Sequence, residues 1–182
     1  MNNRLRVSAA ALALAFGAAI AAARQGAPQA PPKPGPDTKK LDAFAGKWQG
    51  EAQMKPGPWG PGGKITSQDD CAWFEGGWQL VCNTSGTSPM GAIKGQGVMA
   101  WKPEEKAYEY MGYDSMGTTM HGMGTVSGNT WSWKSTDKVG GKTVQSRYVV
   151  TLTSPTTQTF KWETSEDGKT WTTLAEGKST KR

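Results

Sequence analysis

The sequence has few of the residues on which metal centres and nucleophilic catalysis depend. Its 182 residues include one histidine, His121, and two cysteines, Cys71 and Cys82. Structural and catalytic zinc sites draw on several His and Cys ligands, and His-based acid–base catalysis needs partners around the imidazole. This scarcity excludes most metalloenzyme and His-based catalytic layouts.

Long helical segments are missing too. Leu and Ile are scarce, whereas the chain has 24 Gly and 11 Pro residues. From Trp48 onward, apolar and polar residues alternate in short runs separated by turn residues, and no long run shows the helical period of 3.6. The composition argues against a helical bundle, and the length favours one domain with appendages.

The first forty residues predict an exported protein. Residues 1–23 combine Arg4 and Arg6 with an apolar run over 7–20 and small residues at 21–23, the pattern of a secretory signal peptide. An uncleaved anchor is the less favoured alternative, because the run is short and Ala-rich. Residues 24–40 are a Pro-rich linker, expected to stay extended. We expect a domain over 41–182, no transmembrane segment after cleavage, and a periplasmic or secreted bacterial location.

The positive charge of the chain lies mostly outside this expected domain. The formal net charge is +6, but residues 41–182 hold 15 basic and 14 acidic residues. The basic residues of the domain cluster only at the C-terminus, at Lys178, Lys181 and Arg182. A nucleic-acid-binding face needs Lys and Arg gathered along one surface, so no nucleic-acid partner is expected.

Alternation of residue types predicts strands. In the run 48–54, Trp48, Gly50, Ala52 and Met54 share one face, and Gln and Glu occupy the other. Turn residues divide the rest into about nine or ten strands, near 48–54, 64–74, 78–85, 93–101, 107–114, 118–126, 130–136, 142–153, 157–164 and 171–180. Consecutive hairpins without a helical crossover predict an all-β, up-and-down antiparallel meander that closes into a barrel.

The two cysteines give a test of this register. If Gly76 and Gly77 form a two-residue turn, opposite residues have numbers that sum to 153, so Cys71 faces Cys82. In an exported protein this pairing predicts a structural disulfide. A free thiol or a metal site at these positions is the alternative.

The start of the expected domain resembles the lipocalin-like, or calycin, barrels. In those proteins a short helical turn leads into a Gly-x-Trp motif, and Gly46 and Trp48 match it. The stretches 95–117 and 165–171 resemble one bacterial family of such barrels that carries a domain-of-unknown-function label. The resemblance implies a barrel whose Trp closes one end and whose cavity holds a small apolar molecule. It also implies an Arg of the last strand packed on that Trp, with Arg182 as the candidate by position.

Aromatic residues supply the candidate binding site. We expect a small hydrophobic molecule to bind in a partly aromatic cavity and to be oriented by Tyr108, Tyr110 or His121. The candidate ligand-binding residues are Trp48, Trp73, Tyr108, Tyr110, His121, Met123, Trp131, Trp133 and Trp162. A barrel filled by its own side chains is the alternative.

Two further functions stay open. His121 and Met123 share one face of a strand, and imidazole with thioether suits Cu(I), so a copper-binding protein is one alternative. Haem is a weaker variant, because the haem-binding relatives use a His late in the chain and none follows His121. The loop 55–63, with Trp59, is the candidate contact of an envelope interaction module. No cofactor is expected, and no catalytic constellation is found: the Gly-rich run at 95–100 and the Ser-x-x-Lys pattern at 135–138 lack the required helices.

Overall fold

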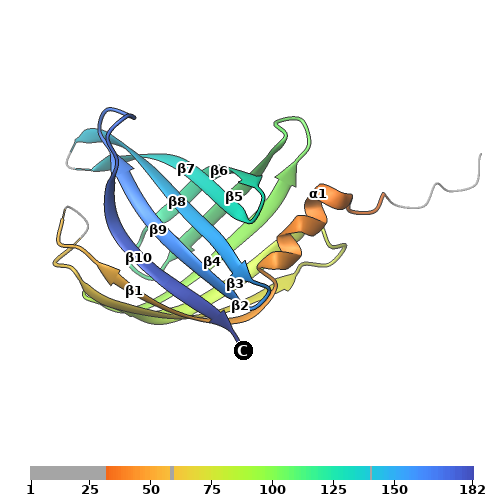
Figure 1. Ribbon diagram of the computed structural model, residues 1–182, viewed down its shortest axis with the longest axis horizontal. Helices are drawn as coiled ribbons and strands as arrows, with labels where there is room; N and C mark the ends of the chain where they lie inside the picture. Colours follow the sequence, from red (N-terminus) through yellow and green to blue (C-terminus); the bar gives the residue numbers. More distant parts are fainter. Residues whose placement is uncertain (1–31, 58–59, 140) are drawn as a thin grey trace, which may run out of the picture. The chain divides into compact units, whose positions relative to one another are not determined.

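Ten antiparallel strands follow one another along the chain and close into a barrel (Figure 1). The structure is a computed structural model, and it describes residues 32–57, 60–139 and 141–182. The elements are α1 (Pro36–Lys39), η1 (Lys40–Ala43), β1 (Gly46–Met54), β2 (Gly63–Trp73), β3 (Gln79–Ser88), β4 (Gly91–Lys102), β5 (Ala107–Asp114), β6 (Thr119–Ser127), β7 (Thr130–Val139), β8 (Lys142–Ser154), β9 (Thr157–Ser165) and β10 (Thr172–Lys181). Each strand pairs with its neighbours in sequence, and β1 pairs with β10 to close the barrel. The predicted all-β meander is confirmed.

The alternation in the first strand separates the inside of the barrel from the outside. Trp48, Gly50, Ala52 and Met54 are buried, whereas the residues between them are exposed. Successive residues along a strand point to opposite faces of the sheet. The inner face of β1, together with the pairing of the strands, therefore identifies the inward residues of all ten strands. Any residue paired across the ladder with an inward residue also points inward.

The folded part of the chain begins before Leu41, inside the stretch expected to be linker. Residues Pro36–Lys39 form a helix with Pro at its start, where the missing N–H costs no hydrogen bond. Thr38 is buried, and the Tyr108 hydroxyl donates to the carbonyl of Asp37 at 2.9 Å. These contacts hold the segment against the barrel, so residues 36–40 belong to the folded body. The expected signal peptide and residues 24–31 lie outside the described residues.

An aromatic plug fills the end of the barrel next to η1. Leu41 and Phe44 are buried there, and the Phe44 ring lies edge-on to Trp131 and Trp133, with centroids 5.0 and 5.5 Å apart. Tyr108 packs on Trp131 at 4.7 Å in the same edge-on manner. Such pairs add to the stability that burial of apolar surface supplies. We call Phe44, Tyr108, Trp131 and Trp133 the aromatic plug.

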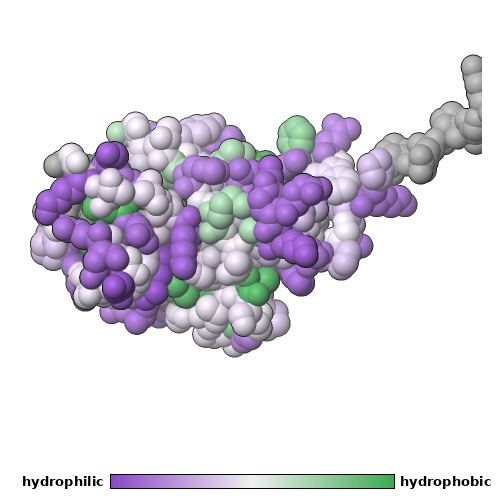
Figure 2. All heavy atoms as spheres, turned by 90° about the horizontal axis from the view of Figure 1, so that it is seen from above, coloured by the Kyte–Doolittle hydropathy of each residue, from purple (hydrophilic) through white to green (hydrophobic). Residues whose placement is uncertain are grey.

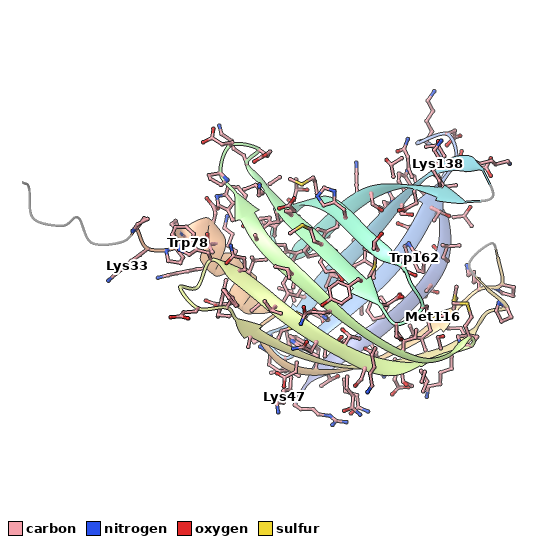
Figure 3. The ribbon with its side chains drawn as sticks, turned by 180° about the vertical axis from the view of Figure 1, so that it is seen from behind. Lys33, Lys47, Trp78, Met116, Lys138 and Trp162 are labelled. Atoms are coloured by element: carbon pink, nitrogen blue, oxygen red, sulfur yellow. A yellow bond between two sulfur atoms is a disulfide. The ribbon has the colours of Figure 1, made fainter. Side chains whose placement is uncertain are left out.

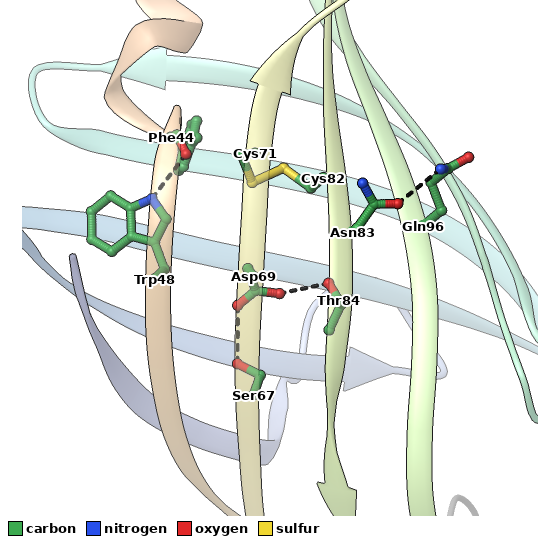
Figure 4. The surroundings of a disulfide bond; sticks show 9 residues. All are labelled: Phe44, Trp48, Ser67, Asp69, Cys71, Cys82, Asn83, Thr84 and Gln96. Carbon is green, nitrogen blue, oxygen red and sulfur yellow. Dashed lines mark hydrogen bonds between the residues drawn. A yellow bond between two sulfur atoms is a disulfide. The ribbon is translucent and has the colours of Figure 1, made fainter. Parts of the chain in front are cut away.

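A disulfide joins β2 and β3, as the register predicted (Figure 4). Cys71 pairs with Cys82 in the ladder, and their Cα atoms are 4.0 Å apart. The connecting loop is longer than the predicted two-residue turn: the Phe74 N–H bonds the Gln79 carbonyl at 2.8 Å, so the loop lies between these two residues. The loop is longer by one residue on each side, which leaves the pairing of Cys71 with Cys82 unchanged. It does exchange the hydrogen-bonded and non-hydrogen-bonded pairs of the ladder. The short Cα separation suits a non-hydrogen-bonded pair.

The outer face of the barrel is polar and carries ion pairs between neighbouring strands. Examples are Lys64 with Glu51 at 3.1 Å and Arg147 with Glu163 at 2.6 Å. On the face drawn in Figure 2, hydrophobic residues form small separate patches among hydrophilic ones. None of the helices in the described part of the chain has the length and apolar character needed to cross a bilayer.

Candidate functional site

Beyond the aromatic plug, the inner wall of the barrel is lined by a mixture of aromatic and polar side chains. The register turns Asp69 and Thr84 inward on β2 and β3, next to the disulfide, as Figure 4 shows. It turns Tyr110 inward on β5, Tyr148 on β8 and Trp162 on β9. We call the space bounded by these five residues and Phe160 the lumen. Figure 3 shows Trp162 among the strands, and Lys138 pointing away from the barrel.

The lumen is not filled by side chains. Tyr148 points inward, yet 40% of its surface is exposed, whereas its ladder partner Trp133 in the plug is only 8% exposed. An inward side chain keeps such exposure only if the space in front of it is not filled. The barrel is therefore packed solid at the plug and hollow next to it.

Inward glycines help to create this space. The ring of Tyr110 lies along the wall over Gly97 and Gly112, where an added Cβ would lie 2.8 and 2.9 Å from the tyrosine oxygen. Only glycine permits so close an approach. Other inward positions occupied by glycine are Gly50, Gly86, Gly95, Gly122, Gly124 and Gly177.

Asp69 is the acidic group of the lumen. Its carboxylate accepts hydrogen bonds from the Ser67 hydroxyl at 3.0 Å and from the Thr84 hydroxyl at 2.5 Å. Burial, the Asp69 charge and the neighbouring Tyr110 together raise the pKa of the Tyr148 hydroxyl. Burial also raises the pKa of Tyr110, with Asp69 as the next cause. Both phenols therefore stay neutral and can donate hydrogen bonds into the lumen at physiological pH.

Three buried polar atoms of the inner wall have no hydrogen-bond partner among the described residues. They are the indole Nε1 of Trp133, the hydroxyl of Ser146 and the side-chain oxygen of Gln158. All three residues lie on inward positions, on the consecutive strands β7, β8 and β9. Buried polar atoms are nearly always bonded, so these three need water or a bound molecule.

The wall of the barrel is interrupted between β6 and β7. The two strands pair only from Met123 to Ser127 and from Thr130 to Lys134. Beyond this region a hollow of about 650 Å³ lies between them. It is lined by residues of both faces, including inward Ser135 and Ser146 and outward His121. Side chains of the inner and the outer face thus meet at this hollow.

A second hollow, of about 660 Å³, lies at β1, β2, β9 and β10, lined by outward charged residues and by inward Ala52, Phe160 and Gly177. Glu51, Lys64, Lys161 and Glu176 frame it, and they are joined in two ion pairs of 3.1 and 3.6 Å. These charges satisfy one another, so the lumen is the better candidate site.

The structure divides the predicted aromatic site between core and lumen. Trp48, Tyr108, Trp131 and Trp133 are buried in the packed end of the barrel, so they do not line an open cavity. The Trp73 indole N–H instead donates to Asp42 at 2.7 Å. Tyr110 and Trp162 are the predicted residues that the structure brings together at the lumen.

His121 and Met123 lie on the outside of the barrel, which corrects the expectation that His121 orients a ligand in the cavity. They do share one face, but it is the face of Met111 and Glu109. His121 Nε2 lies 2.9 Å from Glu109 Oε1, and this hydrogen bond is the main cause that lowers the pKa of Glu109. The glycines Gly122 and Gly124 take the inward positions instead. The described residues contain no group of three or more His, Cys, Asp or Glu suited to a metal ion.

Sequence reasoning missed Asp69, Tyr148 and Phe160. The cysteine register already contained the signal for Asp69, because a residue two positions before Cys71 must share its face. Tyr148 and Phe160, whose rings are 5.5 Å apart, sit in apolar strands where nothing in the pattern distinguishes a lumen wall from a packed core. Trp59, the other predicted contact, falls in a gap between the described ranges.

The Trp of the Gly-x-Trp motif is covered by Lys181 rather than by Arg182. The Lys181 ammonium lies 5.0 Å from the centre of the Trp48 ring, and the Trp48 indole N–H donates to the Phe44 carbonyl at 2.9 Å. Lys181 pairs with Trp48 in the ladder, so it shares the inner face. Arg182, one residue further, points to the other face and bonds Gln49.

Residues 33–181 match the protein family described as "Protein of unknown function (DUF1579)". The chain belongs to this family. No curated protein matches its sequence. Its residues 41–182, expected as one domain, fall within this match except for the last residue.

Solved structures show the same fold at low sequence identity. The crystal structure of Rv2717c from M. tuberculosis is 12% identical and superimposes with a TM-score of 0.57, over 81% of this chain and 98% of that chain. A de novo designed fluorescence-activating β-barrel is 11% identical with a TM-score of 0.45, over 79% of this chain and 98% of that chain. The Rv2717c likeness supports the ten-stranded barrel as the fold of this DUF1579 member.

Proposed function

We propose that this protein binds a small molecule with an apolar body in the lumen of its barrel. The observation that carries the proposal is the 40% exposure of the inward side chain of Tyr148. A hollow lined by aromatic rings with a few convergent polar groups is the usual form of a small-molecule site. Affinity would come from burial of apolar surface against Tyr148, Phe160 and Trp162, and orientation from the hydroxyls and Asp69.

We also propose that the protein is exported and lipocalin-like. Its support is the signal-like sequence of residues 1–23, the Cys71–Cys82 disulfide and the Gly46–Trp48 motif with Lys181 over the indole. Disulfides persist in oxidising compartments such as the bacterial periplasm. We propose that the barrel acts there as a carrier or sensor of its ligand, without covalent chemistry.

Binding of N-phenyl-1-naphthylamine, a neutral apolar dye that fluoresces in dry surroundings, tests the proposal. We expect saturable binding to the wild-type protein. Replacing Tyr148 by Ala removes part of the wall of the lumen. We expect the dissociation constant of the dye to rise about tenfold, because part of the apolar burial against an aromatic side chain is lost.

The matched control is Tyr113→Ala. Tyr113 is also an accessible tyrosine, but it points outward from β5 and donates to Gln96 at 2.9 Å. We expect this variant to bind the dye as the wild type does. Absence of saturable binding, or an equal loss in both variants, would show that the lumen is not the binding site.

A further inference from the structure

The lumen carries an acidic charge that forms no ion pair in the described part of the chain; Lys181, which shares the inner face, lies over the Trp48 ring instead. Acids on the outside are paired with bases on neighbouring strands, as Asp70 is with Lys47 at 3.6 Å and Glu163 with Arg147 at 2.6 Å. Asp69, adjacent to Asp70 but inward, has no Lys, Arg or His within ion-pair distance in the described part of the chain.

Two other acids of the described residues, Asp114 and Asp137, take inward positions, and Asp137 accepts the Ser135 hydroxyl at 3.1 Å. Asp114 accepts the N–H groups of Met116 and Thr118 at 2.9 and 3.0 Å and thereby holds the β5–β6 turn. Asp69 accepts only two hydroxyl hydrogen bonds, whereas a carboxylate can accept about four. It therefore has acceptor positions left for a donor that enters the lumen.

Aromatic rings share the inner face of the barrel with this carboxylate. The accessible ring of Tyr148 packs against Phe160 at 5.5 Å, and Trp162 is the ladder partner of Tyr148. The faces of aromatic rings carry partial negative charge and attract organic cations. A carboxylate and several aromatic faces within one hollow form the chemical environment that an ammonium group prefers, and one that repels anions.

We infer that the ligand is an organic cation, an amine or quaternary ammonium group joined to an apolar body. The cationic group lies toward Asp69, and the apolar body lies against Tyr148, Phe160 and Trp162. This inference rests on the proposed function, because it names the class of molecule that the same lumen binds.

Three amphiphiles with the same decyl chain show whether binding depends on charge or only on the apolar chain. The experiment measures how well each displaces N-phenyl-1-naphthylamine from the exported protein. The three compounds are decyltrimethylammonium, decanol and decanoate, each used below its micelle concentration. We expect the cation to displace the dye at a concentration at least about tenfold lower than decanol, as charge-assisted contacts commonly contribute. Decanoate is expected to be the weakest of the three.

Asp69→Asn tests the residue, and Asp70→Asn is its matched control. The first variant keeps the shape and an acceptor for Thr84 but removes the charge, so its preference for the cation over decanol should fall well below that of the wild type. The second removes an equal charge from the outside and should retain the preference. A second readout needs no variant: added salt should reduce the preference of the wild type for the cation.

The outcomes distinguish the two proposals. If the dye binds but all three amphiphiles displace it equally, or if Asp69→Asn keeps the preference for the cation, the lumen binds apolar molecules and this inference is wrong. If neither the dye nor any amphiphile binds, the proposed function itself fails, and this inference fails with it.

Discussion

Gly124 and Trp133 face each other across β6 and β7, and the indole of Trp133 lies directly over the glycine. A Cβ at position 124 would lie 2.6 Å from Trp133 Cδ1. Because Trp133 is fixed in the aromatic plug, Gly124→Ala should lower the free energy of unfolding by about 1–3 kcal/mol, the cost of overpacking a core. Urea denaturation followed by Trp fluorescence measures this loss.

The control for that variant is Gly35→Ala. Gly35 precedes α1, and an added Cβ there meets no atom within 4 Å. We expect its unfolding midpoint to stay close to that of the wild type. Equal stability of the Gly124→Ala protein would mean that Trp133 is free to move, contrary to the packed plug.

Removal of the Cys71–Cys82 disulfide should destabilise the barrel. The bond closes a short loop between β2 and β3, with a sequence separation of 11. Restriction of the unfolded chain by such a loop stabilises the native state by about 3 kcal/mol. The double variant Cys71→Ala, Cys82→Ala should therefore unfold at lower urea concentration. A reducing agent should lower the wild-type midpoint and leave that of the double variant unchanged.

The tyrosine hydroxyls of the lumen should ionise late. Burial, followed by the Asp69 charge, raises the pKa of Tyr148, so the folded protein favours the neutral phenol. That contribution to stability is complete below the ordinary tyrosine pKa of about 10 and is lost as the pH rises through the higher folded-state pKa. In Asp69→Asn, Tyr148 should ionise at lower pH than in the wild type.

An alkaline titration of phenolate absorbance measures this shift, and Tyr148→Phe identifies which step belongs to Tyr148. Asp70→Asn, on the outer face, should leave the titration as it is in the wild type. An unchanged Tyr148 step in the Asp69→Asn protein would contradict the closeness of these two groups in the lumen.

The β9–β10 turn should be sensitive to acid. The backbone N–H groups of Thr170 and Lys169, each 2.7 Å from Asp167 Oδ1, and the Ser165 hydroxyl hold the pKa of Asp167 well below its usual range. A lowered pKa stabilises the fold above the unfolded-state value near 4, and this stability is lost as the pH falls through the folded-state pKa.

Asp167→Ala should accordingly melt at a lower temperature than the wild type at neutral pH. The difference should shrink progressively as the pH is lowered from about 4 toward the folded-state pKa of Asp167, where the wild-type carboxylate becomes protonated too. Thermal unfolding at a series of pH values checks this prediction. A difference that stays constant down to the lowest pH would show that the carboxylate charge is not what stabilises the turn.

Turn residues and alternation are enough to predict the strands and one register. Gly76 and Gly77 centre the β2–β3 hairpin, so Cys71 and Cys82 can be paired by counting outward from the turn. In β1 the polar residues alternate strictly with Trp48, Gly50, Ala52 and Met54, which leaves one choice of inner face.

The sequence of the glycine-rich strand β6 does not identify its inner face in this way. There His121 and Met123 alternate with Gly122 and Gly124, and the larger residues are the ones that the pattern favours for the interior. The structure reverses this, because Trp133 covers Gly124 from the neighbouring strand and leaves no room for an inward side chain. The inner face of such a strand depends on residues that lie in other strands, and a single-strand pattern does not contain them.

The parallel indoles of Trp131 and Trp133, 5.6 Å apart and inclined by only 12°, make the plug visible to spectroscopy. The electronic transitions of two rings held so close couple to each other, so the near-ultraviolet spectrum of the plug should change if the rings separate. Trp162 stands on the lumen wall, where an incoming molecule would alter its emission. Closure of the barrel end and occupancy of the hollow can thus be followed by two independent optical signals in the unlabelled protein.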